Sequence, residues 1–247
     1  MKQRADVLLV SRGLCESRTR AQALIMAGAV YSGERRIAKP GDAVPEDAPL
    51  RVAEAPRFVS RGGDKLEGAL GAFAANGLDV AGRVAVDVGA STGGFTDCLL
   101  QRGAAKVYAV DVGWGQLHAK LRVDARVVVM ERTNARSLEA RSFAEPVTLV
   151  VVDASFIGIG KLMPAIAAML VPGGDLVALV KPQFEAGREA VARGRGVIRD
   201  EAVRARAIAD ALVEIEAAGF VVVGSVDSAV AGPKGNVEHL VHARRSG

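Results

Sequence analysis

Two kinds of apolar pattern alternate along most of this chain. Short runs rich in valine predict strands at 83–88, 106–111, 126–130, 147–152, 175–181, 220–227 and 237–243. Between them, apolar residues recur every three or four positions and predict helices near 63–76, 94–103, 115–121, 160–170 and 200–218. Strands that are apolar on both faces and alternate with helices are typical of a mostly parallel sheet covered on both sides. The pattern therefore predicts an α/β fold built on a seven-stranded sheet.

The first fifth of the chain has a different pattern. Helices are predicted at 4–13 and 18–27, and short strands around 29–31, 36–38 and 50–53. Together these elements would form a small α+β module. The following segment contains Pro56, which discourages a helix. We therefore expect a first domain at 1–54, a linker at 55–60 and a larger domain at 61–247.

Positive charge is concentrated near the N-terminus. The whole chain has a formal charge of +4, and its first 40 residues hold eight basic and three acidic side chains. A local basic face is a better sign of an RNA partner than the overall charge, although a solvated helix face gives the same pattern. Aromatic residues make up only 4% of the chain, which disfavours a base-stacking platform as the main binding surface. The candidate RNA-binding residues are Arg4, Arg18, Arg20, Arg35, Arg36 and Arg61.

The cysteines and the apolar segments indicate where the protein works. Cys15 and Cys98 imply no disulfide framework and fit a reducing compartment. Neither has a Cys or His at metal-ligand spacing, so no metal site is predicted. The N-terminal segment does not have the pattern of a signal peptide, and no apolar stretch is long enough to span a membrane. We therefore expect a cytoplasmic protein without a membrane or metal partner.

A glycine-rich loop follows the strand predicted at 83–88. It leads into a helix, and loops at the carboxyl ends of parallel strands hold ligands. Glycine lets the backbone approach a cofactor where a Cβ would clash. Asp111, at the end of the next strand, can accept hydrogen bonds from both hydroxyls of a ribose, and Asn134 would lie near an adenine edge. The candidate cofactor-binding residues are Asp87, Gly89, Ala90, Ser91, Thr92, Gly93, Gly94, Phe95, Asp111, Asn134 and Asp153.

Two nucleotide cofactors compete for this loop. NAD requires a Gly-x-Gly-x-x-Gly pattern, of which Gly89 and Gly94 supply the first and last positions while Ser91 replaces the middle glycine. Asp87 suits a cofactor with a cationic amino-acid end better than one with a pyrophosphate. We therefore favour S-adenosylmethionine over NAD. A glycine turn needed only for packing stays the simplest alternative.

Four charged residues in distinctive phrases indicate the chemistry: Ser-Arg-Gly-Gly-Asp-Lys65, Val-Val-Asp153-Ala-Ser-Phe, Val-Lys181-Pro-Gln-Phe-Glu and Gly-Asn-Val-Glu238-His. A ribose 2′-hydroxyl is too weak an acid to attack unaided at neutral pH, and a buried lysine beside a second cation can take its proton. Lys181 is best placed for that role and Asp153 would orient it. Lys65 and Glu238 would fix the hydroxyl. Each residue alone is also consistent with a surface charge, so the prediction rests on the set.

The sequence resembles the TlyA, or haemolysin A, family nearly from end to end. The N-terminal module is similar to the S4 RNA-binding domain through Arg4-Ala-Asp-Val-Leu-Leu-Val and through residues 17–30. The remainder is similar to FtsJ-type ribosomal RNA methyltransferases. The phrases that carry this second likeness are Val59-Ser-Arg-Gly-Gly-Asp-Lys65-Leu, the loop 87–97, Asp111-Val-Gly-Trp-Gly-Gln-Leu117, Glu131-Arg-Thr-Asn134, Asp153-Ala-Ser-Phe-Ile157, Lys181-Pro-Gln-Phe-Glu185 and Gly232-Pro-Lys-Gly-Asn-Val-Glu238. Thr92 stands where the wider FtsJ-type loop usually has proline, which fits the haemolysin branch.

The resemblance implies a fold, an activity and a partner. The fold is an S4-like domain followed by a Rossmann-like, S-adenosylmethionine-dependent methyltransferase sheet. The activity is 2′-O-methylation of ribose, which family members perform on cytidines of ribosomal RNA in one or both subunits. Lys65, Asp153, Lys181 and Glu238 take the positions of the family's catalytic tetrad. A catalytically silent RNA-binding or assembly factor and, less consistent with the sequence, a membrane-active haemolysin are the alternatives, and both a monomer and a dimer stay open.

Overall fold

The chain forms two compact units, Met1–Pro56 and Arg57–Gly247. The computed structural model describes residues 2–26, 28–53, 56–187, 194, 196–232 and 234–247. One apolar cluster lies in the first unit and two lie in the second. Each unit therefore has a core of its own, as separate domains do.

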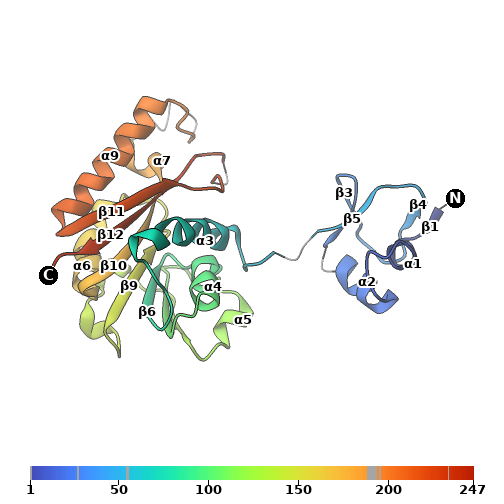
Figure 1. Cartoon of the computed structure of the whole chain (residues 1–247), viewed down its shortest axis with the longest axis horizontal. Helices are drawn as coiled ribbons and strands as arrows, with labels where there is room; N and C mark the ends of the chain where they lie inside the picture. The colour runs from blue at the N-terminus through green and yellow to red at the C-terminus, as the bar shows by residue number, and fades with distance from the viewer. Residues whose placement is uncertain (1, 27, 54–55, 188–193, 195, 233) are drawn as a thin grey trace. The chain divides into compact units, whose positions relative to one another are not determined.

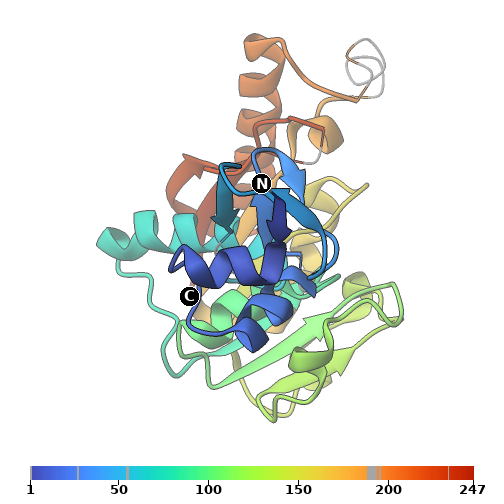
Figure 2. The same ribbon diagram turned by 90° about the vertical axis from the view of Figure 1, so that its right-hand side faces the viewer.

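The first unit packs two helices against short antiparallel ladders (Figure 2). Its helices are α1 (Ala5–Ser11) and α2 (Arg18–Met26), which contact each other. β1 (Lys2–Arg4) pairs with β4 (Ala43–Pro45), while β2 (Val30–Ser32) pairs with both β3 (Arg35–Arg36) and β5 (Leu50–Val52). Apolar side chains from both helices and from β2 and β4 fill the space between them, namely Leu8, Leu9, Ile25, Val30 and Val44.

The second unit alternates strands and helices, as expected (Figure 1). The strands of its sheet are β6 (Val84–Val88), β7 (Lys106–Val110), β8 (Val127–Met130), β9 (Val147–Val152), β10 (Leu170–Val180), β11 (Phe220–Asp227) and β12 (His239–Arg245). Its α-helices are α3 (Arg61–Phe73), α4 (Gly94–Gln101), α5 (Ala119–Arg122), α6 (Met163–Met169), α7 (Pro182–Glu185) and α9 (Glu201–Ala217). Short 3-10 turns follow at η1 (Ala74–Asn76), η2 (Ala135–Ser137), η3 (Ala140–Ser142) and η4 (Ile159–Lys161). Within the described ranges, no helix is both long and apolar enough to cross a membrane.

The sheet confirms the predicted seven-stranded, mostly parallel fold. Its strand order is β11-β12-β10-β9-β6-β7-β8, and β12 runs antiparallel to both of its neighbours. From β6 the chain moves outward through β7 and β8, then returns to place β9 on the other side of β6. In open α/β sheets, ligands bind at such a reversal, beside the carboxyl ends of the strands. The fold therefore places a ligand site where β6 and β9 end.

Both faces of the sheet are covered because neighbouring residues of each strand point to opposite sides. Val86 and Val150 pack on the side of α6 and α9, whereas Ala85 and Val151 pack on the side of α3 and α4. The valine-rich strands are thus buried on both faces, as their continuous apolar runs predict. The result is a rigid platform for the loops that follow the strands.

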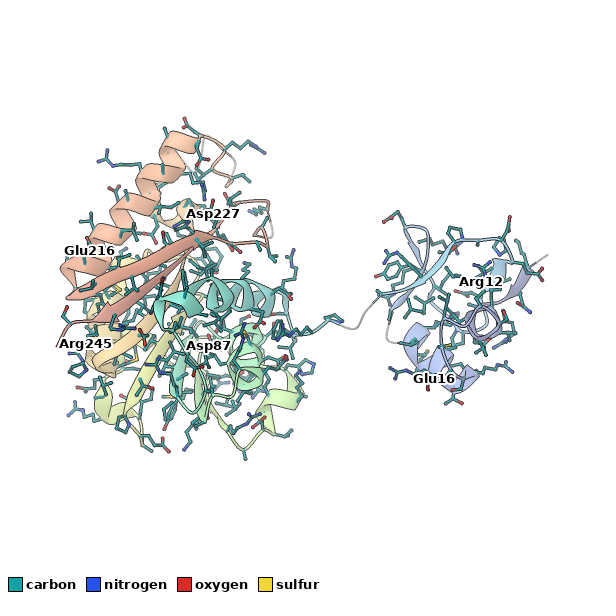
Figure 3. All side chains as sticks on the ribbon, viewed as in Figure 1. Arg12, Glu16, Asp87, Glu216, Asp227 and Arg245 are labelled. Atoms are coloured by element: carbon teal, nitrogen blue, oxygen red, sulfur yellow. The ribbon has the colours of Figure 1, made fainter. Side chains whose placement is uncertain are left out.

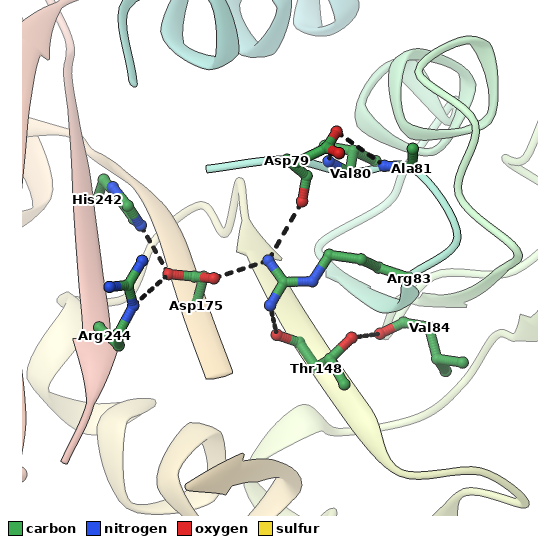
Figure 4. Close-up of polar contacts among 9 residues, drawn as sticks. All are labelled: Asp79, Val80, Ala81, Arg83, Val84, Thr148, Asp175, His242 and Arg244. Carbon is green, nitrogen blue, oxygen red and sulfur yellow. Dashed lines mark hydrogen bonds and ion pairs between the residues drawn. The ribbon is translucent and has the colours of Figure 1, made fainter. Parts of the chain in front are cut away.

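A polar network fastens the end of the sheet away from those loops (Figure 4). Asp175 accepts hydrogen bonds from Arg83 (2.7 Å), from His242 Nε2 (2.8 Å) and from Arg244 (3.1 Å). Burial alone would raise the pKa of Asp175, but the hydrogen bonds from His242 and Arg83 hold it at about 2. Arg83 also donates to the carbonyl of Thr148 (2.8 Å). The network therefore ties β9, β10 and β12 to the segment that opens β6.

Part of the stretch expected to link the domains packs on the second unit. We expected a linker at 55–60; residue 55 lies outside the described residues, and Arg57–Ser60 form part of the second unit. Phe58 is only 3% exposed and the backbone N–H of Val59 donates to Asp97 Oδ2 (2.9 Å). This stretch packs on the sheet domain because the apolar ring of Phe58 is buried there and the amide of Val59 finds an acceptor.

Candidate active site

A cavity of about 1020 Å³ opens where β6, β9 and β10 end. It lies at the topological reversal of the sheet, where a ligand site is expected. Three segments of the chain supply most of its wall: the start of α3, the glycine loop after β6 and the loop after β9. The four predicted catalytic residues all line it: Lys65, Asp153, Lys181 and Glu238.

The glycine loop reaches the cavity because its backbone is tightly folded. Gly89 has φ +86°, and a Cβ there would lie 2.9 Å from the carbonyl oxygen of Asp153. Only glycine fits such a position without strain. Ser91, which replaces the middle glycine of the NAD pattern, nevertheless adopts φ +48°. The loop residues that line the cavity are Gly89, Ala90, Ser91, Thr92, Gly94 and Phe95.

Asp111 fastens the outer part of this loop. Its carboxylate accepts hydrogen bonds from the backbone N–H of Ser91 (2.8 Å) and of Gly113 (2.7 Å). Asn134 is exposed and its side chain caps η2 through the N–H of Arg136 (3.1 Å). Asp111 and Asn134 follow neighbouring strands but do not line the cavity. They lie on the β7–β8 side of the glycine loop, as the prediction of a nucleoside site requires.

Asp87 is completely buried at the end of β6, in the interior of the second unit (Figure 3). Thr96 donates a hydrogen bond to its Oδ2 (2.6 Å), while its Oδ1 has no partner. Burial and, to a lesser extent, the nearby Asp153 carboxylate raise the pKa of Asp87 to about 7, and the hydrogen bond from Thr96 opposes this rise. A buried carboxylate oxygen without a donor is unusual and can accept a hydrogen bond from a cationic or N–H partner, although Asp87 itself does not line the cavity.

The four predicted catalytic residues form two lysine–carboxylate pairs. Lys65 Nζ lies 2.5 Å from Glu238 Oε2, and Lys181 Nζ lies 2.6 Å from Asp153 Oδ1. Lys65, Lys181 and Glu238 are 8%, 7% and 1% exposed. Lys181 also donates to Ser155 Oγ (2.8 Å). The pairs bring together segments that lie far apart in the sequence, and both face the same cavity.

The start of α3 is positioned by close backbone packing. A Cβ on Gly63 would overlap the ring of Phe58, and a Cβ on Gly94 would overlap the hydroxyl of Ser60. A Cβ on Gly62 would lie 3.7 Å from Asp153 Oδ2. The first turn of α3 therefore fits between Phe58, α4 and the Lys181–Asp153 pair, which fixes where Lys65 enters the cavity.

The loop after β9 presents an aromatic ring at the cavity. Phe156 is 91% exposed and has φ +66°, an uncommon backbone conformation for a bulky residue. Its ring centroid lies 5.3 Å from that of Phe184. Glu185 accepts a hydrogen bond from the N–H of Ile159 (2.9 Å) and so ties this loop to α7. Strain of this kind persists where the surroundings hold the backbone and is frequent at functional sites.

Comparison with known proteins assigns this arrangement to a family. The pattern of the FtsJ-like methyltransferases matches residues 58–245, and the S4 domain matches residues 3–48. The chain belongs to the FtsJ-like methyltransferase family. The prediction of an S4 domain joined to an FtsJ-type methyltransferase is confirmed, and with it the predicted enzyme class and the cofactor S-adenosylmethionine.

Several relatives of this FtsJ-like methyltransferase match along nearly its whole length. The 16S/23S rRNA (cytidine-2′-O)-methyltransferase TlyA of Mycobacterium tuberculosis is 46% identical and covers 98% of this chain and 90% of its own. Hemolysin A of Brachyspira hyodysenteriae is 42% identical, and the match covers 97% of this chain and 98% of the relative. A solved structure from Streptococcus thermophilus is 43% identical, covers 99% and 89%, and superposes with a TM-score of 0.75.

The residues of this FtsJ-like methyltransferase fit its cofactor. The unpartnered Oδ1 of Asp87 suits a cationic amino group. The left-handed turn at Gly89 leaves the loop without a side chain where the backbone passes the end of β9. Asp111 has a carboxylate held in place by two backbone amides. Together these groups match the amino-acid and ribose ends of S-adenosylmethionine.

The S4 domain of the FtsJ-like methyltransferase contains a buried acid that is not among the predicted site residues. Asp6 is fully buried and accepts hydrogen bonds from Arg4, Arg18 and Gln22 at 2.9–3.0 Å. Chiefly the hydrogen bond from Arg4 holds the pKa of Asp6 well below its usual range. Arg4 and Arg18, which are predicted to contact RNA, are therefore already ion-paired with Asp6. Three more of the predicted RNA-binding residues in the first unit, Arg20, Arg35 and Arg36, are exposed. The last one, Arg61, belongs to the second unit and lines its cavity.

Proposed function

We propose that this protein methylates the ribose 2′-hydroxyl of a cytidine in ribosomal RNA, with S-adenosylmethionine as methyl donor. The observation that carries the proposal is the pair of buried lysine–carboxylate contacts facing one cavity beside the glycine loop. The relative in Mycobacterium tuberculosis, which matches the chain over both domains, is named for this reaction. The acceptor ribose would occupy the cavity between the two pairs.

Lys181 is the proposed base. For this role it must be neutral, and it then donates two N–H groups to Asp153 and Ser155 while its lone pair faces the hydroxyl. S-adenosylmethionine supplies an electrophilic methyl group on a positively charged sulfur. As the ribose oxygen gains the methyl group and the carbon–sulfur bond breaks, Lys181 would take the hydroxyl proton. Alignment of these atoms by the rigid strand ends contributes much of the rate enhancement.

Lys65 and Glu238 would hold the hydroxyl in place. Lys65 enters from α3 with an ammonium fixed by Glu238 at 2.5 Å. A cation held in a poorly solvated site stabilises the negative charge that develops on the attacking oxygen. Phe156 offers an exposed ring at the same cavity, on which the base of the acceptor nucleotide can stack.

The S4 domain is proposed to dock the enzyme on RNA. Arg20, Arg35 and Arg36 are exposed and lie outside the Asp6 network. Exposed arginines bind phosphates and make the affinity fall with salt. A ribosomal RNA substrate places the reaction in the cytoplasm, and ribosomal subunits are the proposed partners.

Labelled methyl transfer from S-adenosylmethionine to unmodified 30S and 50S subunits tests the proposal. Lys181→Ala removes the base, and loss of a general base costs roughly 100-fold or more in rate. The matched control is Lys106→Ala, which also breaks a lysine–carboxylate pair, that of Lys106 with Glu145 where β7 begins. We expect Lys106→Ala to transfer methyl groups normally. Equal transfer by Lys181→Ala and the wild type would rule out the assigned mechanism.

The alternative of a catalytically silent RNA-binding factor is not favoured. A chain that has lost activity has no need to keep four charged residues paired around one cavity. One relative is called Hemolysin A, and within the described residues no helix is long and apolar enough to cross a membrane. Subunit binding without methyl transfer by the wild type would favour the silent factor.

A further inference from the structure

The single tryptophan of the chain lies exposed in the loop after β7, outside the cavity. Trp114 is 70% exposed and its neighbour Val112 is 73% exposed. Large apolar side chains are usually buried, so two of them so close together on the surface indicate a contact surface. The loop begins at Asp111, beside the proposed cofactor site.

Arg132, from the loop after β8, lies over the tryptophan. Its guanidinium carbon is 5.0 Å from the centroid of the indole ring. The backbone of Arg132 has φ +54°, which disfavours a long side chain. Its N–H donates to the carbonyl of Gly113 (2.9 Å), and the next N–H, of Thr133, donates to the backbone carbonyl of Asp111 (2.9 Å). Two hydrogen bonds therefore hold the two loops together and fix the arginine above the ring.

No neighbouring carboxylate among the described residues forms an ion pair with Arg132. The adjacent Glu131 is paired with Arg122 and accepts the N–H of Gln116 (3.1 Å). Asp111 accepts two backbone amides. Across the described ranges, Arg132 makes no ion pair. The surface thus combines a flat aromatic ring with a positive charge held over one of its faces.

We infer that Trp114 and Arg132 form a second RNA contact, in which an unpaired base stacks on the indole face that the guanidinium does not cover and its phosphate binds the guanidinium. The inference rests on the proposed function, because it assumes an RNA substrate. An aromatic ring accepts any base, and an arginine beside it attracts the backbone. Because the pair lies outside the cavity that holds the tetrad, the bound base belongs to a nucleotide other than the methylated one. The contact therefore orients the RNA relative to the catalytic domain.

Tryptophan fluorescence tests the contact directly, since one indole accounts for all tryptophan emission. Protein-free 16S and 23S rRNA transcripts should quench the emission of the full chain. They should also quench that of Lys181→Ala, so the contact is tested even if methyl transfer fails. S-adenosylhomocysteine alone should leave the emission nearly unchanged. Quenching by S-adenosylhomocysteine together with weaker binding of it to Trp114→Ala would assign the ring to the cofactor pocket and overturn the inference.

Methyl transfer to ribosomal subunits provides the second measurement. Trp114→Ala should raise the KM for the subunits about tenfold with kcat within twofold, as expected for loss of one stacking contact. Trp114→Phe should restore most of the affinity, and Arg132→Ala should raise the KM and make it less dependent on salt. Val213→Ala, an exposed valine on α9, should behave as the wild type. An unchanged KM in Trp114→Ala would refute the contact, whereas absent transfer by the wild type would refute only the proposed function.

Discussion

Each buried lysine of the cavity depends on its carboxylate partner. Lys65 and Glu238 are almost completely shielded from water, at 8% and 1% exposure. A buried ion pair adds little to stability by itself, but a buried charge without its partner is strongly unfavourable. The pair is therefore better explained by chemistry than by stability, and this distinction can be measured.

Glu238→Gln leaves Lys65 buried without a counter-charge. We expect it to lower the free energy of unfolding by about 3 kcal/mol and to abolish most methyl transfer. The double variant Lys65→Met/Glu238→Leu removes both charges and should regain most of that stability while staying inactive. Urea unfolding and labelled methyl transfer measure the two effects. Activity in the double variant would contradict the assigned roles of both residues.

Asp87 predicts a pH dependence of cofactor binding. Burial raises its pKa to about 7, so below pH 7 the carboxyl is mostly protonated in the free enzyme. If Asp87 binds the cationic amino group of the cofactor, as proposed, that group favours the ionised form and a proton leaves when the cofactor binds. Affinity should therefore fall by up to about tenfold for each pH unit below 7 and level off above it. Calorimetric titration with S-adenosylhomocysteine from pH 6 to 8.5 measures this, and Asp87→Asn should lose the dependence. If the affinity of the wild type does not change with pH, Asp87 does not bind the amino group of the cofactor.

At the scale of elements, the strands could be predicted and the pairings between them could not. Asp87, Asp111, Asp153 and Lys181 lie at or just past strand ends that a local apolar pattern reveals. The contact between Lys65 and Glu238 joins residues 173 positions apart, and no local pattern encodes such a distance. The ladder between β1 and β4 was missed for the same reason.

Other differences arise because side chains hold backbone that would otherwise be helical. The helix expected at 115–121 is only Ala119–Arg122. The side chain of Asp111 accepts a hydrogen bond from the N–H of Gly113, and that of Glu131 accepts one from the N–H of Gln116. Gly115 between them has φ +72°. Side-chain acceptors that compete with the helical hydrogen bonds favour a loop. In unit 1, the isolated acid Asp6 gave no sign in the sequence that it would engage Arg4 and Arg18.

The position of α3 can be tested with two glycines of the same helix. A Cβ on Gly63 would overlap the ring of Phe58, so Gly63→Ala must displace either the ring or the start of the helix. We expect it to cost about 1–3 kcal/mol of stability and to reduce methyl transfer, because Lys65 lies two residues further on. Gly71 has open space around it, so Gly71→Ala should raise stability by up to about 1 kcal/mol. Thermal unfolding compares the two, and full activity in Gly63→Ala would show that the helix start tolerates displacement.

At the scale of the whole molecule, two domains share one task. The sheet domain holds the proposed catalytic tetrad and the proposed cofactor loop, while the S4 domain carries exposed arginines outside the Asp6 network. If the S4 domain only docks RNA, changes in its arginines should alter affinity and leave the catalytic step unchanged. Uniform binding energy of this kind changes KM without changing kcat.

The two arginines of β3 allow a sharp version of this prediction. Neighbouring strand residues point to opposite faces, and the guanidinium of Arg36 lies beside Gly28, where an added Cβ would be 2.8 Å from it. Arg35 is therefore the freer phosphate contact. Arg35→Ala should weaken RNA binding and reduce the steepness of the plot of log affinity against log salt by about 0.7–0.9, the value for one phosphate contact. Arg36→Ala should do less, and Arg206→Ala, which removes the same charge from α9, should do nothing. A docking surface on the S4 domain requires the loss of RNA affinity to depend on the position of the arginine. Equal losses of affinity in all three variants would therefore mean that RNA responds only to the overall charge of the protein.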